Sequence, residues 1–194
     1  MVWRYVDTSV VQMTFHTRSG PLVVVKKEGG IFEMDFPAIV AHHDAAKAKR
    51  EIPFLEEEVF GGKTKVVELL RTKRDYIAVV ATEESVKELA PRFDKLSEMD
   101  LIGLIVTAKS SAQGVDFISR AFFPRLGVNE DPVCGSAHCE MAPYWAAQLG
   151  KTIFTAHQLS RRGGQLHVEL KGDRVSLSGT VAPYLEGFIH IPIQ

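Results

Sequence analysis

Most of the chain consists of short apolar segments bounded by turn residues, and only two stretches repeat apolar residues at helical spacing. One helix is predicted from Glu83 to Met99, with Thr82 as its N-cap, and the other from Ser136 to Leu149, ended by Gly150. The predicted strands lie at residues 13–17, 22–25, 31–36, 66–70, 76–81, 101–107, 115–123, 153–159, 165–170, 174–178 and 182–191. Strands surrounding two helices predict an α+β fold with mostly antiparallel pairing.

Two segments depart from this pattern of strands and helices. Pro143 lies inside the second predicted helix, so this helix either bends there or begins later than Ser136. Residues 38–62 are polar and contain Pro53 and the pair Gly61-Gly62. This segment is therefore predicted to be a linker or a domain boundary.

The composition narrows the classes of function. A formal net charge of −1 gives no overall field that would attract nucleic acid or an anionic membrane. The apolar runs are far shorter than the ~20 residues that a membrane span needs, and the first ten residues do not resemble a signal peptide. Two cysteines, Cys134 and Cys139, do not form a secreted disulfide framework. We expect a soluble, cytoplasmic protein without nucleic-acid or membrane partners.

The residues best suited to chemistry lie where a loop enters the second helix. The free N–H groups and the dipole of a helix start can hold an anion such as a substrate carboxylate. Gly135 allows close approach of a ligand, and the Ser136 hydroxyl can either cap the helix or bond the ligand. The same positive end would lower the pKa of Cys134, and Asp131 supplies a carboxylate beside it. From these residues alone, the alternative is a simple N-cap serine and a turn aspartate.

Other histidines and cysteines do not indicate a metal site. His138 lies in the first turn of the same helix, where it either points toward a ligand or takes part in packing. The spacing of the soft ligands matches no standard zinc pattern, so neither a metal nor another cofactor is predicted. The groups considered were His42-His43 with Asp44, and Cys134, His138, Cys139 and His157.

Several motifs in order resemble the phenazine-biosynthesis-like (PhzF) family. The strongest is Asn129 to His138, followed by Ala142 to Lys151. The resemblance covers roughly residues 13 to 190. Further similar segments are Phe15–Leu22, Met34–Pro37, Asp116–Pro124, Gln158–Gly164 and Gly179–Gly187.

This resemblance implies a diaminopimelate-epimerase-like fold, in which two similar lobes each wrap a sheet around a central helix. The substrate lies in the cleft between such lobes. On this basis residues 1–37 are predicted to be the last strands of an N-terminal lobe, and residues 38–180 the C-terminal lobe. Residues 181–194 are predicted to form a closing strand that can return to the first lobe.

The resemblance also implies a reaction. Family members of known chemistry isomerise a small cyclic amino acid or a related acid by moving a proton, without metal, pyridoxal phosphate or nucleotide. By correspondence, Asp131 is a site aspartate, while Gly135 and Ser136 hold the substrate carboxylate. Cys134 stands where this branch usually has threonine and the epimerases have a catalytic cysteine. It is either a proton donor and acceptor or an idle substitute for threonine.

The family's first-lobe glutamate and its Cys-Gly-His-Ala-Thr-type loop have no counterpart in this sequence. Proton transfer needs acid–base groups on both sides of the substrate. We therefore expect either a shortened isomerase that needs the missing lobe for activity, or a catalytically inactive binding protein of the same fold. The resemblance also suggests a homodimer.

Overall fold

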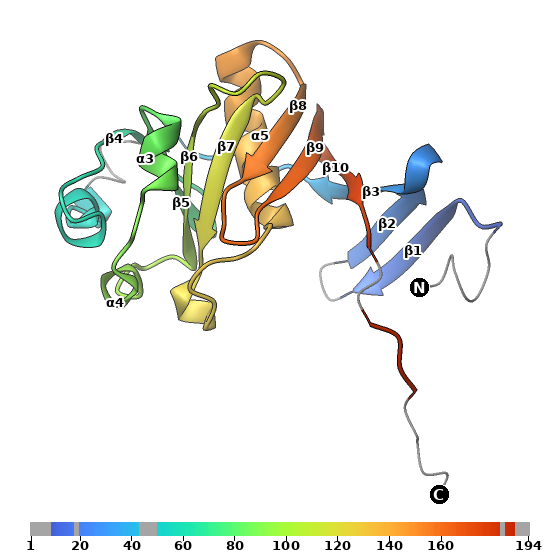
Figure 1. The fold of residues 1–194 in the computed structure, drawn as a ribbon, viewed down its shortest axis with the longest axis horizontal. Helices are drawn as coiled ribbons and strands as arrows, with labels where there is room; N and C mark the ends of the chain where they lie inside the picture. The colour runs from blue at the N-terminus through green and yellow to red at the C-terminus, as the bar shows by residue number, and fades with distance from the viewer. Residues whose placement is uncertain (1–8, 18–19, 43–49, 183–184, 189–194) are drawn as a thin grey trace, which may run out of the picture. The chain divides into compact units, whose positions relative to one another are not determined.

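The computed structural model describes residues 9–17, 20–42, 50–182 and 185–188. The chain forms two compact units (Figure 1). The larger unit is Asp35–Leu177, and the smaller one combines Met1–Met34 with Ser178–Gln194. The assignment of residues 1–37 to a first lobe stays a prediction.

The smaller unit contains a β-hairpin. Strands β1 (Gln12–Thr17) and β2 (Gly20–Lys26) pair antiparallel, with Phe15 opposite Leu22. A single 3-10 turn, η1 (Glu28–Gly30), leads to β3 (Ile31–Pro37), which lies beside β2. The predicted closing strand at 182–191 is wrong for its described residues, because residues 182 and 185–188 have no strand structure.

The larger unit is built on a mixed sheet whose strands are ordered β10-β9-β8-β7-β6-β5-β4. The pairs β4–β5, β6–β7 and β8–β9 are antiparallel, whereas β5–β6 and β7–β8 are parallel. Parallel neighbours need a long crossover connection, and helices supply it in both cases. The prediction of mostly antiparallel pairing is confirmed for the described pairs, although the two parallel pairs were not predicted individually. The strands are β4 (Val66–Arg71), β5 (Asp75–Val80), β6 (Gly103–Lys109), β7 (Phe117–Phe122), β8 (Ile153–Gln158), β9 (Gly164–Lys171) and β10 (Arg174–Thr180).

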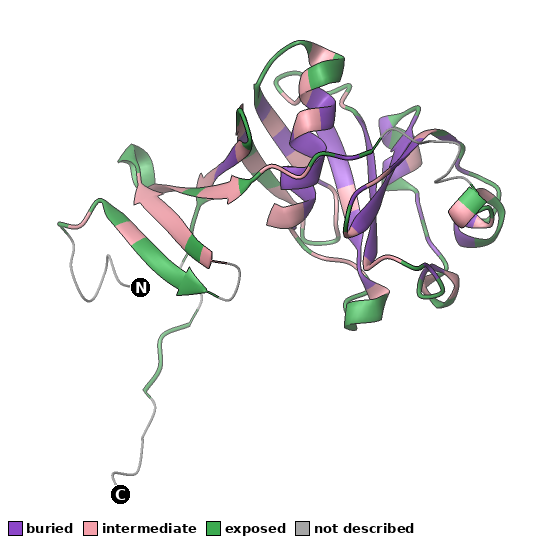
Figure 2. Cartoon of the chain, turned by 180° about the vertical axis from the view of Figure 1, so that it is seen from behind, coloured by how far each residue is buried: buried purple, intermediate pink, exposed green. Residues whose placement is uncertain are grey.

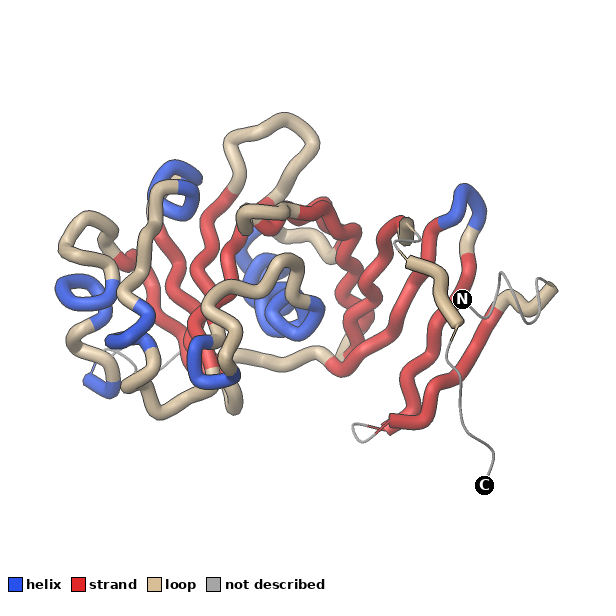
Figure 3. Tube along the Cα trace, turned by 60° about the horizontal axis from the view of Figure 1, so that its bottom comes forward, coloured by secondary structure: helices blue, strands red, loops and turns tan. Residues whose placement is uncertain are grey.

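Alternate side chains of the central strands enter two separate cores, one on each face of the sheet. On β5, Ile77 and Val79 join the core that contains helix α5 (Gly135–Leu149). Tyr76, Ala78 and Val80 join the core on the other face. Figure 2 shows the resulting buried band through the middle of the larger unit, and Figure 3 shows α5 with strands of this unit on both sides of it.

The first predicted helix is broken in two. Thr82 is its N-cap as predicted, since its hydroxyl accepts a hydrogen bond from the Ser85 N–H at 3.1 Å. Helix α3 (Glu83–Lys87) ends well before Met99, and α4 (Phe93–Leu96) follows as a separate turn. Pro91 lies between them and disfavours helical backbone at the residue before it, so the continuous helix was a wrong prediction.

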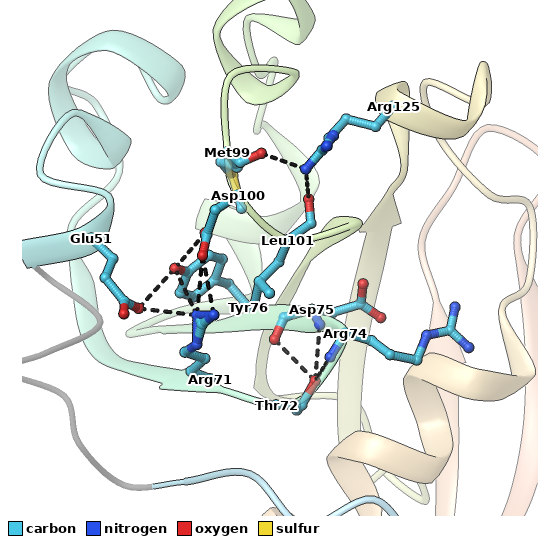
Figure 4. A network of polar contacts seen from close by, with 10 residues as sticks. All are labelled: Glu51, Arg71, Thr72, Arg74, Asp75, Tyr76, Met99, Asp100, Leu101 and Arg125. Carbon is cyan, nitrogen blue, oxygen red and sulfur yellow. Dashed lines mark hydrogen bonds and ion pairs between the residues drawn. The ribbon is translucent and has the colours of Figure 1, made fainter.

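The predicted linker at 38–62 is wrong for residues 50–62. This stretch forms a π-helical turn, η2 (Leu55–Val59), and buries Ile52, Leu55 and Phe60 in the second core. Polar contacts fasten it to the sheet (Figure 4). Glu51 accepts hydrogen bonds from Tyr76 at 2.9 Å and from Arg71 at 3.2 Å, and both donors also contact Asp100.

Helix α5 runs without interruption past Pro143. Proline has no N–H, so it leaves the carbonyl of Cys139, four residues earlier, without its helical donor. The Ile39 N–H donates to this carbonyl at 3.1 Å. The helix ends as predicted at Gly150, which adopts left-handed backbone with φ 64°. Within the described residues, no helix is both long enough and apolar enough to cross a membrane.

Candidate active site

The loop between β7 and α5 carries the predicted site residues. A 3-10 turn, η3 (Pro124–Leu126), reverses the chain after β7, and Asp131 then donates its N–H to the carbonyl of Ala121 at 2.9 Å. The neighbouring Glu130 accepts two hydrogen bonds from Arg120, at 2.7 Å to Nε and 3.0 Å to Nη2. The loop is therefore anchored to β7 by its backbone and by an ion pair.

A single buried side chain holds both ends of the segment from Asp131 to Cys134. Gln158, at the end of β8, donates from Nε2 to the carbonyl of Asp131 at 2.6 Å. Its Oε1 accepts from the N–H of Cys134 at 2.8 Å. Gln158 is only 1% exposed, so these bonds form in a water-poor environment where unpaired groups are costly.

The turn between β8 and β9 supports the same segment from the outside. The Ser160 hydroxyl donates to the carbonyl of Pro132 at 2.6 Å and accepts from the N–H of Gly163 at 3.0 Å. At Gly164 the fit is closer still, because a Cβ there would lie 2.4 Å from Cγ2 of Val133. The Gln158–Gly164 segment, one of those that resemble a family motif, thus positions the site loop.

The start of α5 is open to a ligand. Cys134 is the N-cap residue, yet no side chain caps the helix, and the N–H groups of Gly135 and Ser136 have no hydrogen-bond partner among the described residues. Ser136 is inside the helix, so the alternative that it is an N-cap is wrong. Its hydroxyl instead lies 3.3 Å from Sγ of Cys134. Free N–H groups at a helix start favour a bound anion.

The Cys134 thiol differs from the expected reactive thiolate. It is 8% exposed, and burial raises its pKa. The hydrogen bond with Ser136 lowers the pKa by less than burial raises it, and the negative charge of Asp131 raises it further. The prediction of a lowered pKa is therefore wrong for this structure: desolvation of the thiolate outweighs the stabilisation that the hydroxyl gives it.

His138 is fully buried and faces the interior. Its Nδ1 donates to the carbonyl of Cys134 at 2.7 Å, and its ring contacts Phe117. Burial lowers its pKa to about 4, so the imidazole is neutral at neutral pH. This geometry gives His138 a role in fixing the N-cap residue; its predicted role in substrate binding stays a prediction.

A buried pair of carboxyl groups lies between the site helix and the start of β5. Glu140 of α5 accepts a hydrogen bond from the Thr72 hydroxyl at 2.9 Å, and Asp75 begins β5 close by. Both carboxyl groups are fully buried. Burial raises the pKa of Asp75, and burial together with the charge of Asp75 raises the pKa of Glu140 to about 8. Sequence patterns gave no signal for this pair, because each acid stands alone in its segment.

Of the five predicted site residues, the structure places four in one constellation: Asp131, Cys134, Gly135 and Ser136. Next to them an open pocket of about 450 Å³ is lined by Glu130, Pro132, Ser160, Arg161 and Arg162. Among the described residues, no three His, Cys, Asp or Glu side chains are grouped to hold a metal ion. Gln158 and Ser160 lie in a segment that resembles a family motif, but their positioning roles were not predicted from the sequence.

The fold and the site define a class: an α+β protein in which a clamped loop feeds an uncapped helix start suited to a small anion. The chain belongs to the PhzC-PhzF family of phenazine biosynthesis-like proteins, whose family model matches residues 4–187.

Two bacterial relatives are both described as uncharacterized isomerases. The one from Halalkalibacterium halodurans is 40% identical over 186 residues, which is 95% of this chain and 67% of the relative. The one from Pseudomonas aeruginosa is 42% identical over 187 residues, 95% of this chain and 66% of the relative. The chain thus spans about two thirds of the length of these relatives.

Solved structures of the same family share the fold. A PhzF-family protein from Enterococcus faecalis matches with a TM-score of 0.81 and 40% identity, over 92% of this chain and 65% of that protein. A PhzC/PhzF protein from Clostridium difficile matches with a TM-score of 0.80 and 33% identity, over 98% of this chain and 69% of that protein. The predicted PhzF-like fold is confirmed at this level.

Proposed function

We propose that this protein is a PhzF-type isomerase or epimerase that moves a proton on a small carboxylate or amino-acid-like substrate without a cofactor. The observation that carries the proposal is the uncapped start of α5. There the N–H groups of Gly135 and Ser136 have no partner in the described part of the chain, and they lie at the positive end of a 15-residue helix. The description of two relatives as isomerases supports the reaction class.

In this proposal the substrate carboxylate accepts hydrogen bonds from the two free N–H groups and from the Ser136 hydroxyl. Asp131 orients the reacting part of the substrate or exchanges a proton with it. Gln158 holds these groups in their relative positions through its two hydrogen bonds to the loop. Proton transfer requires a second acid–base group on the opposite side of the substrate carbon. We propose that this group comes from the part of the longer relatives that this chain does not match.

Deuterium exchange tests the reaction directly. The chain, alone and fused to the N-terminal third of the Halalkalibacterium relative, is incubated in D₂O with a panel of small amino and carboxylic acids. Exchange at a carbon next to the carboxylate is followed by NMR. We expect exchange in the fusion, with Asp131→Asn and Ser136→Ala lowering it at least about tenfold, which is about 1.4 kcal/mol of transition-state stabilisation. Asp94→Asn and Ser97→Ala, exposed at α4, serve as matched controls.

An absence of exchange from the fusion would reject the isomerase, and an absence of carboxylate binding at α5 as well would also reject the anion site. Cys134→Ser separates the two possible roles of the thiol. Unchanged exchange in this variant would identify Cys134 as an idle substitute for threonine. Loss of exchange with carboxylate binding retained would assign the proton transfer to the thiol.

The second candidate is a binding protein of the same fold that has lost the reaction. It is favoured by the raised pKa of Cys134, because a protonated thiol is a poor proton acceptor at neutral pH. This candidate predicts that carboxylates bind to the α5 start while the fusion shows no exchange. Binding measured by amide chemical shifts of Gly135 and Ser136, beside the exchange assay, distinguishes the two.

We also propose that the protein self-associates as a homodimer and acts in the cytoplasm. On the smaller unit Phe15 is 42% exposed and Met34 39% exposed, and exposed apolar side chains favour association. Light scattering coupled to size-exclusion chromatography tests the dimer. A monomeric mass at micromolar concentration would refute it.

A further inference from the structure

The turn between β8 and β9 presents two adjacent arginines beside an open pocket. Arg161 and Arg162 are exposed, and neither makes a hydrogen bond or an ion pair with any described residue. Together with Glu130, Pro132 and Ser160 they line the space of about 450 Å³ described above. This volume suits a small ligand.

The charge of this pocket is positive. Its one acidic residue, Glu130, is already paired with Arg120 through two hydrogen bonds, with side-chain exposures of 19% and 12%. Glu130 is thereby neutralised by a group outside the pocket, whereas Arg161 and Arg162 have no counter-charge among the residues that the structure describes. Arginine presents a planar fork of donors that matches carboxylate and phosphate oxygens.

The backbone that carries these arginines is fixed in place. Ser160 holds both sides of the turn, through the carbonyl of Pro132 and the N–H of Gly163. Gly163 adopts left-handed backbone with φ 69°, and Gly164 packs directly against Val133. A fixed backbone reduces the entropy that is lost when arginine side chains order around a ligand.

We propose that Arg161 and Arg162 form a binding site for the oxyanion of a small molecule, a carboxylate or a phosphate, separate from the helix start of α5. The small volume and the net charge of −1 favour a small solute over a nucleic acid. This site does not depend on the isomerase proposal, because it uses neither Gly135 nor Ser136.

The test is a titration of the isotopically labelled chain with inorganic phosphate and, separately, with malonate, at constant ionic strength set by chloride. Binding is followed by the amide signals of Gly163 and Gly164 and by the arginine Nε–H signals. We expect saturable shifts at the β8–β9 turn with at least one of the two anions. Phosphate alone would identify a phosphate site, and malonate alone a carboxylate site.

Substitutions define the residues responsible. Arg161→Gln with Arg162→Gln should weaken binding at least tenfold. The control Arg50→Gln with Lys109→Gln changes the net charge equally at exposed positions outside the pocket, and should change binding less than twofold. Since all four side chains are exposed, the variants should fold, and an unfolding curve of each verifies this.

Three results would overturn the proposal: no saturation with either anion, equal weakening by the control, or unchanged binding in the double arginine variant. Ser136→Ala distinguishes the two sites. If this variant abolishes the shifts and the arginine variant does not, the anion binds at the α5 start, and the arginine pocket is rejected while the isomerase site stands.

Discussion

The N–H of Ile39 donates to the carbonyl of Cys139 at 3.1 Å, and this carbonyl is the one that Pro143 leaves without a helical donor. A residue that would ordinarily disturb a helix is thus accommodated by a neighbouring segment of the larger unit. The same segment is held to the start of β10 as well, since Ala38 donates to the carbonyl of Asp173 at 2.8 Å and Asp35 pairs with Arg174.

Pro143→Ala should weaken the hydrogen bond from the Ile39 N–H to the Cys139 carbonyl of α5. Alanine restores an N–H that competes for the Cys139 carbonyl, so the amide of Ile39 should exchange with solvent faster than in the wild type. Hydrogen exchange followed by NMR measures this, with the amide of Ala38 as the internal control because its acceptor is Asp173. An unchanged exchange rate at Ile39 would show that its hydrogen bond does not depend on the proline.

Gln158→Leu should disorder the site loop and destabilise the fold. The change leaves the Cys134 N–H and the Asp131 carbonyl buried without partners, each at a cost of about 1–3 kcal/mol. Chemical denaturation should show that the free energy of unfolding falls by an amount within that range or above it. Carboxylate binding at α5 should weaken. Gln148→Leu, exposed on α5, is the matched control. If Gln158→Leu binds carboxylate as tightly as the wild type, Gln158 has no role in positioning the site.

Gly164→Ala should be harmful for a purely steric reason. Its new methyl group would lie 2.4 Å from Val133 Cγ2, so the loop or the strand must move. The double variant with Val133→Ala should recover most of the stability lost. Gly179→Ala is the control, because a methyl group there meets no atom within 4 Å. Additive effects of the two substitutions would contradict the contact.

The buried carboxyl pair should make stability fall with rising pH. The pKa of Glu140 is about 8 in the folded protein and 4.5 in an ordinary environment, so between these values the folded state holds a proton that the unfolded state has lost. The free energy of unfolding therefore decreases by up to about 1.4 kcal/mol per pH unit for this one group.

His138 acts in the opposite direction at lower pH. Its pKa of about 4 in the folded protein, against 6.5 ordinarily, makes stability rise with pH between these values. The two effects oppose each other up to pH 6.5, and only the loss from Glu140 remains between 6.5 and 8. Urea unfolding across this upper window should show the decline in the wild type and a flatter profile in Glu140→Gln. Equal slopes of the unfolding free energy against pH in the two proteins would refute the assignment of this decline to Glu140.

The positions of the elements were largely predictable because their causes are local. Alternating apolar residues and glycine turns marked the strands, and Gly150 marked the end of α5. Pro91 was also visible in the sequence, and the helix through it was predicted only because the apolar spacing continued on both sides. The parallel pairs were not predictable from strand patterns, since alternation does not reveal which strand is the neighbour.

A candidate site could be proposed from the sequence where it depends on one continuous segment. Asp131, Gly135 and Ser136 were proposed from the loop and the helix start, and their roles stay predictions. Gln158 lies in a segment that resembles a family motif, but its positioning role was not predicted, because that role follows from tertiary packing. The pKa of Cys134 was wrongly predicted for the same reason: the helix start is read from sequence, whereas the burial that opposes it depends on the whole fold.

The two hydrogen bonds from Gln158 to the loop have a consequence for the order in which the chain folds. During synthesis the loop and the whole of α5 leave the ribosome before β8 and β9, because Gln158 lies 24 residues after Cys134. Domains form progressively as their segments emerge, and a parallel strand pairs only after its crossover is complete. The two hydrogen bonds from Gln158 to the loop can therefore form only after β8 has been synthesised and has paired with β7. A nascent chain that stalls before that point lacks the contacts that fix the loop at the start of α5.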